Sequence, residues 1–151
     1  MVTLSPIGIV NNSRKVVEDD NWGEIISIIE LDSAITEEAL LQIEEFSHAE
    51  IFYYFHLVDA SKIEKGARHP RNNKDWPKVG FFAQRGKNRP NRLGATIVKV
   101  IKREGSQLFV QGLDAIDGTP VLDIKPVMKE FLPHEEVRQP AWATDLMKNY
   151  W

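Results

Sequence analysis

The sequence has no cysteine among its 151 residues. Without a thiol the chain can form no disulfide bond, no thiolate zinc site, no iron–sulfur cluster and no cysteine nucleophile. The absence of disulfides suits a reducing compartment, so we expect the protein to be cytoplasmic.

Long apolar segments are missing as well. No apolar run approaches the roughly 20 residues that a membrane-spanning helix requires. The N-terminal residues do not place a basic segment before an apolar one, as a secretory signal peptide does. We therefore expect neither a membrane span nor a signal peptide.

The motifs of several large enzyme classes are absent. No two of the nine glycines are separated by a single residue, which excludes the G-x-G loop of Rossmann domains. The sequence also contains no Walker A, H-E-x-x-H or G-x-S-x-G motif. Nothing therefore indicates a P-loop NTPase, a zincin-type protease or an α/β-hydrolase.

The composition is that of a folded domain. Hydrophobic residues make up 42% of the chain and charged residues 27%, which is typical of soluble globular proteins. A chain of this length fits one domain, and no repeat, low-complexity tract or linker divides it. We therefore predict a single domain over residues 1–151.

Short strands dominate the predicted secondary structure. Runs of strand length occur at residues 4–10, 22–31, 46–56, 95–103, 107–113 and 121–124. One amphipathic helix is expected to start at Thr36, and a short second one at residues 141–151. With so little helix to cover a sheet, closure into a barrel would protect the strand edges, so the pattern predicts a mainly β, barrel-like architecture.

Residues 46–56, FSHAEIFYYFH, are the most aromatic part of the chain and suit a strand buried on both faces. The two histidines, His48 and His56, would share one face of this strand. Eight residues of strand span roughly 26 Å, which is too far for one metal ion. We therefore expect each histidine to be a hydrogen-bonded polar residue at a strand end, and we predict no metal site.

Positive charge is concentrated in the middle of the chain. Between Lys62 and Arg103 there are thirteen Lys or Arg residues and two acidic ones, a balance of +11. The remainder carries −14, which gives a net charge of −3. Selection for solubility alone would mix the signs, whereas this separation suits a localised polyanion site. The connection 57–78 combines basic residues with Trp76, which suits an RNA-facing loop and a merely solvated loop equally.

Residues 80–94, GFFAQRGKNRPNRLG, form the most basic part of this segment and are called the basic loop below. They hold four cations and no acid: Arg85, Lys87, Arg89 and Arg92. Such a run cannot be buried without neutralising its charge, so we expect a loop. Two interpretations are open: a solvated loop between strands, or a loop that faces an anionic ligand.

Residues 113–126, LDAIDGTPVLDIKP, contain three aspartates: Asp114, Asp117 and Asp123. Asp117-Gly118 predicts a tight turn, in which the aspartate side chain either caps the backbone or holds the hydroxyl or ammonium groups of a ligand. A basic loop and this acidic turn in one site would suit a zwitterionic ligand.

Three segments together resemble the TsaA-like (TrmO) family. They are the N-terminal PIGIV, the aromatic FSHAEIFYYFH, and the pair GFFAQRGKNRPNRLG and LDAIDGTPVLDIKP. The resemblance implies a single-sheet antiparallel β-barrel with one or two short flanking helices, which works as a homodimer. It also implies binding of S-adenosyl-L-methionine and methyl transfer to N6 of threonylcarbamoyladenosine at adenine 37 of tRNA.

The resemblance also assigns residues. The implied cofactor contacts are Phe55, His56, Arg85, Ala95, Asp117, Gly118, Thr119, Pro120 and Val121. In the basic loop we expect Lys87, Arg89, Asn91 and Arg92 to face the RNA. Arg85 suits the methionine carboxylate of the cofactor. As a hypothesis, Asp114 or Asp123 orients or deprotonates the methyl acceptor, since methyl transfer needs mainly in-line placement.

The sequence departs from the family pattern at two places. Arg92 stands where the family has a second proline in R-P-N-P, and the N-terminal Arg-Gln-Pro of the tRNA enzymes is missing around residues 19–23. An Arg-Gln-Pro occurs at residues 138–140 instead. Three functions therefore remain open: a tRNA methyltransferase, a methyltransferase of a small molecule, and a non-catalytic barrel that binds S-adenosylmethionine or RNA.

Overall fold

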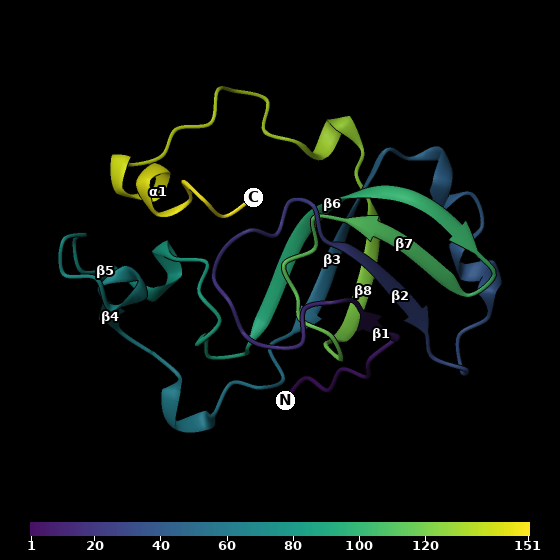
Figure 1. The fold of residues 1–151 in the computed structure, drawn as a ribbon, viewed down its shortest axis with the longest axis horizontal. Helices are drawn as coiled ribbons and strands as arrows, with labels where there is room; N and C mark the ends of the chain where they lie inside the picture. The colour runs from purple at the N-terminus through teal and green to yellow at the C-terminus, as the bar shows by residue number, and fades with distance from the viewer.

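The computed structural model describes residues 1–151 and contains a closed antiparallel β-barrel (Figure 1). Its strands lie in the order β1-β2-β7-β6-β3-β8. They are β1 (Gly8–Asn11), β2 (Ile26–Leu31), β3 (His48–Tyr54), β6 (Leu93–Glu104), β7 (Gln107–Gln111) and β8 (Pro120–Pro126). Because β1 pairs with both β2 and β8, the sheet closes without a free edge. The predicted mainly β barrel is confirmed.

The core fills the inside of the barrel and follows the period of two expected of strands. In β3, Ala49, Ile51 and Tyr53 are buried, whereas the alternating Phe52 and Tyr54 are only half-buried. The prediction that this strand is buried on both faces is therefore wrong. The outer face of a barrel meets solvent unless another layer covers it, and here that face of β3 is only partly covered.

A β-bulge shifts the register between β3 and β8. Phe52 lies opposite Asp123, but Tyr53 lies opposite Val121, so Leu122 is the extra residue. This shift places Val121 in the core and leaves Asp123 exposed on the outside of the barrel.

The helix expected from Thr36 is not formed, and that prediction is wrong. Two short 3-10 helices replace it, η1 (Glu37–Leu40) and η2 (Ile43–Glu45). Gln42 between them has a φ of 68°, a left-handed conformation that interrupts any continuous helix. The apolar stripe still serves its expected purpose, because Leu40 is buried in the core and Ile43 packs against it.

The second predicted helix is present but shorter than expected, since α1 spans Ala141–Leu146. The remaining 3-10 helices are single turns: η3 (Ala60–Lys62), η4 (Pro70–Asn72), η5 (Phe81–Ala83) and η6 (Lys129–Phe131). None of the helices has the length and apolar character needed to cross a membrane.

Residues 57–92, between β3 and β6, form an arm beside the barrel (Figure 1). The arm contains a small sheet of β4 (Ala67–Arg68) and β5 (Val79–Gly80), which the sequence did not predict. The far part of the arm contacts α1 and the loop before β2. The indole Nε1 of Trp76 donates to Asp145 of α1 at 2.8 Å, and Arg71 pairs with Asp20 at 2.9 Å.

Residues 147–151, called the C-terminal tail below, return from α1 to the barrel (Figure 1). The amide of Asn21 donates to the carbonyl of Asn149 at 3.0 Å. The amide of Trp22 donates to the carbonyl of Tyr150 at 2.8 Å. The tail therefore docks along the loop that precedes β2.

Candidate functional site

A carboxylate with three hydroxyl donors lies where β3, β6 and the C-terminal tail meet. Asp114, in the segment between β7 and β8, accepts a hydrogen bond from the hydroxyl of Tyr53 at 2.9 Å and another from the hydroxyl of Thr96, both on Oδ1. Its Oδ2 accepts a hydrogen bond from the hydroxyl of Tyr150. Three elements that are distant in sequence therefore fix one carboxylate.

Both phenols in this cluster act as donors. Burial, together with the negative charge of Asp114, raises the pKa of Tyr53 and that of Tyr150 well above the usual range of a phenol. The two hydroxyls therefore remain protonated at neutral pH. They orient the carboxylate and do not themselves act as bases.

Arg85 of the basic loop lies beside this cluster. Its guanidinium donates to the carbonyl oxygen of Ala95 at 2.5 Å, next to Thr96 on β6. Its positive charge lowers the pKa of Tyr53 and of Tyr150, a smaller effect than burial and Asp114. The acceptor of Arg85 is neutral and the side chain is exposed, so its charge is available to an anion. The structure thus brings together three predicted site residues, Arg85, Ala95 and Asp114.

A second group of predicted residues gathers at the Asp117-Gly118 turn. Gly118 has a φ of 82°, and a Cβ placed there would lie 3.9 Å from Nε2 of His56. The predicted segments 55–56 and 117–121 are therefore neighbours. Phe55 also joins the barrel, since its ring packs edge-on against that of Tyr53 with centroids 5.4 Å apart.

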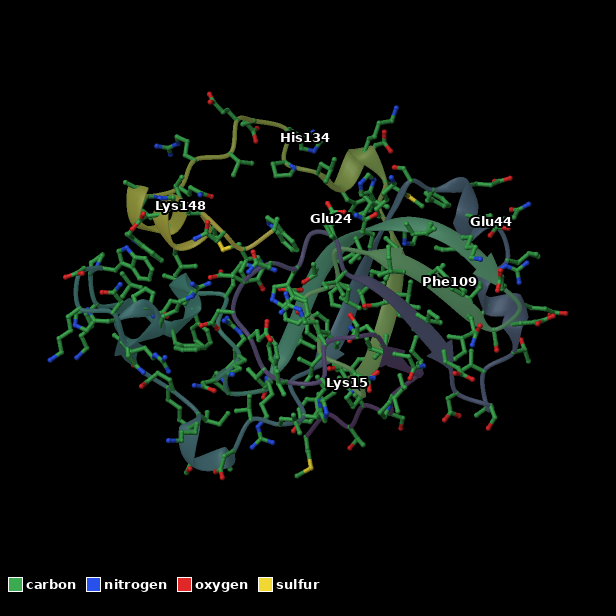
Figure 2. The ribbon with its side chains drawn as sticks, in the orientation of Figure 1. Lys15, Glu24, Glu44, Phe109, His134 and Lys148 are labelled. Atoms are coloured by element: carbon green, nitrogen blue, oxygen red, sulfur yellow. The ribbon has the colours of Figure 1, made fainter.

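Within the turn, the side chain of Asp117 is bonded to other residues of the chain. The carboxylate of Asp117 accepts from the ammonium of Lys15 at 2.8 Å and from the amide of Asn12 at 2.9 Å. These two hydrogen bonds lower the pKa of Asp117. Figure 2 shows Lys15 at the barrel, in the loop that follows β1. Asp117 therefore holds the loop that follows β1 and does not cap the backbone of its own turn.

The other turn residues are also engaged by the protein. The hydroxyl of Thr119 donates to the carbonyl of Ile116 at 2.7 Å, and the side chain of Val121 is in the core. Pro120 begins β8 opposite Ile9 of β1. The side chain of His56 is half-buried and has no hydrogen bond to another residue of the chain.

The remaining cations of the basic loop differ in how firmly they are held. Arg89 donates to the carbonyl of Gln84 at 2.6 Å and lies 5.5 Å from the ring centroid of Phe81. Arg92 donates to the hydroxyl of Tyr54 at 2.6 Å. Lys87 and Asn91 are exposed and make no side-chain hydrogen bond. Of the residues expected to face RNA, Lys87 and Asn91 are therefore the least constrained.

The backbone conformation of Arg92 explains why this chain lacks the second proline of the family pattern. Its φ is 51°, and its amide donates to the carbonyl of Arg89 at 3.0 Å. A proline has φ fixed near −65° and no amide hydrogen, so it cannot adopt this conformation. The loop of this chain therefore has its own local backbone, which a proline here would not permit.

Asp123 is separated from the Asp114 cluster. It is exposed on the outside of the barrel, where its Oδ1 accepts from the amide of Ile124 at 2.9 Å. It borders an apolar hollow that includes Ile7, Leu31 and Phe46. The Arg-Gln-Pro at residues 138–140 is also exposed, and the side chain of Gln139 donates to Thr144. Neither segment contributes to the contacts of Asp114.

The sequence did not reveal the hydroxyl donors of Asp114. Tyr53 has an indirect signal, because it lies within the aromatic strand and two residues before Phe55. The structure gives Gly94 a reason, since a Cβ at this position would lie 2.5 Å from the Tyr53 ring. Tyr150 has no signal in its local sequence, because only the docking of the tail brings it to the barrel.

Gly94→Ala is expected to destabilise the protein by about 1 to 3 kcal/mol, because the new methyl group would displace the packed Tyr53 ring. Urea unfolding measures this loss. Gly80→Ala is the matched control, since no atom lies within 4 Å of a Cβ at that position. A Gly94→Ala midpoint equal to that of the control would contradict the tight packing of Tyr53.

A family model for the tRNA-methyltransferase O N-terminal domain matches residues 18–131. The chain belongs to this family. The resemblance seen in the sequence motifs is thereby confirmed, and the match includes the basic loop, the Asp117-Gly118 turn and Asp114.

Individual relatives agree with this assignment. A human protein named tRNA (adenine(37)-N6)-methyltransferase is 37% identical over 113 residues, which are 75% of this chain and 25% of the human protein. A Pyrococcus abyssi protein, named "Probable S-adenosyl-L-methionine-binding protein", is 35% identical over 143 residues, covering 91% of this chain and 74% of its own. The chain thus spans only a small part of the human relative.

Solved structures share the barrel. The crystal structure of TrmO from Pseudomonas aeruginosa matches with a TM-score of 0.71 and 27% sequence identity. The match covers 91% of this chain and 61% of the Pseudomonas chain. The fold is therefore common to both proteins, and the Pseudomonas chain contains further residues outside the match.

Proposed function

We propose that this chain is an S-adenosyl-L-methionine-dependent methyltransferase that acts on tRNA, at N6 of threonylcarbamoyladenosine at adenine 37. The observation that carries the proposal is the position of exposed Arg85 beside the oriented carboxylate of Asp114. Family membership and the printed names of the relatives support it.

The charges of the site suit the methionine part of the cofactor. Methionine carries a carboxylate and an ammonium group, and Arg85 offers an un-neutralised guanidinium for the carboxylate. His56 and Phe55, next to the Asp117-Gly118 turn, offer aromatic surface for the adenine. Backbone carbonyls near the turn would accept from the ammonium. The residues present therefore fit a zwitterionic nucleoside cofactor.

When bound, the cofactor supplies an electrophilic methyl group on its sulfonium. The chain must then hold the acceptor nitrogen in line with that methyl group, which requires orientation more than a strong nucleophile. We assign this orientation to Asp114, because its hydroxyl donors leave its carboxylate in one fixed position. An acceptor N–H directed at that carboxylate would also have a base to receive its proton.

The distribution of basic residues supports an RNA substrate. The segment 62–103 with its balance of +11 includes most of the arm and the whole basic loop, to which Arg85 belongs. Phosphate groups of RNA are bound mainly by such cations. A methyltransferase of a small molecule does not need this concentration of charge.

We further propose that the chain works as a homodimer in the cytoplasm. The outer face of β6 supports the homodimer, since Leu93 and Ile97 are exposed there on either side of half-buried Ala95. Light scattering of the purified protein tests it, and a monomeric mass at micromolar concentration would contradict it.

Transfer of tritiated methyl groups from S-adenosylmethionine to total tRNA tests the proposed activity. We expect incorporation into tRNAs that carry threonylcarbamoyladenosine, and none into tRNA from cells that lack this modification. No transfer to any tRNA would overturn the proposal. Binding of the cofactor without transfer would then favour a small-molecule substrate or a non-catalytic barrel.

Lys87→Ala is expected to weaken tRNA binding and to reduce the slope of log K against log salt by about 1, because one phosphate contact is lost. Cofactor affinity should change little, since Lys87 makes no contact with the Arg85–Asp114 cluster. Lys129→Ala, an exposed lysine outside the basic segment, is the matched control. Equal loss of tRNA and cofactor binding in Lys87→Ala would contradict this division of the loop.

A further inference from the structure

The contact between Tyr150 and Asp114 joins the C-terminal tail to the candidate site. Tyr150 lies outside the segment 18–131 that the family model matches. Its hydroxyl nevertheless donates to Oδ2 of Asp114, whereas Tyr53 and Thr96 both donate to Oδ1. The tail is thus the sole source of a protein donor to this second oxygen.

The number of acceptor positions that Asp114 has left shows how the contact with Tyr150 restricts a ligand. An ionised carboxylate has about four lone-pair positions on its two oxygens. Two hydroxyls use those of Oδ1, and Tyr150 uses one of Oδ2. One direction on Oδ2 then remains for a ligand N–H. Without Tyr150, that oxygen would offer two directions and the ligand would be held less firmly.

The tail holds Tyr150 through its backbone. The carbonyl groups of Asn149 and Tyr150 accept from the amides of Asn21 and Trp22 at 3.0 Å and 2.8 Å. Gly23 lies against the same segment, because a Cβ there would be 2.8 Å from the carbonyl carbon of Trp151. The position of the phenol therefore depends on close packing between the tail and residues 21–23.

We propose that Tyr150 is a positioning residue of the candidate site, which fixes Oδ2 of Asp114 toward the methyl acceptor when the tail is docked on residues 21–23. This inference rests on the proposed function. It adds a residue from outside the family segment to the site and makes the docked tail a part of that site.

The test compares Tyr150→Phe with wild type in the tRNA methylation assay. We expect kcat to fall about tenfold, because one hydrogen bond to a charged group is lost. The affinity for S-adenosylmethionine, measured by calorimetry, should stay within about twofold, since Arg85 is unchanged. Hydrogen exchange at the amides of Asn21 and Trp22 should also be unchanged. An unaltered kcat in Tyr150→Phe would overturn the proposal.

Gly23→Ala tests the same inference without altering any group of the site. The added methyl should displace the tail, so exchange at the amides of Asn21 and Trp22 should become faster and kcat should fall by a similar factor. Faster exchange with a full kcat would contradict the role of the docked tail.

A double-mutant cycle separates failure of this inference from failure of the proposed function. Unfolding of Tyr150→Phe, Asp114→Asn and the double variant should be less than additive, because the two side chains share one contact. If wild type methylates no tRNA, the proposed function fails, and the positioning role fails with it even where the cycle shows coupling. If wild type is active but the cycle is additive, only the Tyr150 inference fails.

Discussion

Replacement of Asp114 by asparagine is expected to slow methyl transfer to tRNA by about 100-fold. Asparagine keeps the shape of the side chain and can still accept on one oxygen from Tyr53 and Thr96. It removes the negative charge, however, and places an amide donor where Oδ2 now accepts from Tyr150. The rate under saturating tRNA and cofactor measures the effect.

Asp123→Asn is the matched comparison. Both aspartates belong to the same motif, and the sequence alone could not choose between them. Asp123 lies on the outside of the barrel and bonds only to the adjacent amide of Ile124, so its replacement should change the rate far less. Equal losses in the two variants would contradict the assignment of the reaction to the Asp114 cluster.

Replacement of Arg92 by proline is expected to destabilise the protein by about 3 kcal/mol or more. The native φ of 51° is closed to proline, and the amide bond to the carbonyl of Arg89 would be lost. The guanidinium bond to Tyr54 would be lost as well. Urea or thermal unfolding measures the change.

Arg92→Asn separates these contributions. Asparagine tolerates a left-handed backbone and keeps the amide hydrogen, so only the contact with Tyr54 is removed. We expect a loss of about 1 kcal/mol. An equally small loss of unfolding free energy in Arg92→Pro and Arg92→Asn would mean that the loop can adopt a second backbone conformation. The explanation given for the missing family proline would then be wrong.

Local patterns predicted the parts of the fold that depend on neighbours in sequence. The hairpin of β6 and β7 follows from two alternating segments around Gly105, which has a φ of 58°. The tight turn at Asp117-Gly118 follows from residues that suit a positive φ. The basic loop was recognised from composition alone, and the structure places its Arg85 beside Asp114 through the pairing of distant segments.

Features that depend on distant contacts could not be predicted. The single helix at Thr36 failed because Gln42 adopts a left-handed conformation, which its sequence does not announce. The separation of Asp123 from Asp114 depends on a one-residue bulge at Leu122, and an extra residue reverses the side that every later side chain faces. Tyr150 reaches Asp114 only because the tail docks on another loop.

Calorimetric titration with S-adenosyl-L-methionine tests the central claim most directly. Wild type should bind one molecule per chain, and Arg85→Ala should bind at least about tenfold more weakly, because it loses a charge-assisted hydrogen bond to the cofactor carboxylate. Lys87→Ala, two residues away in the same loop, should bind as wild type does. No saturable binding by wild type, or the same affinity in Arg85→Ala, would contradict the cofactor site proposed here.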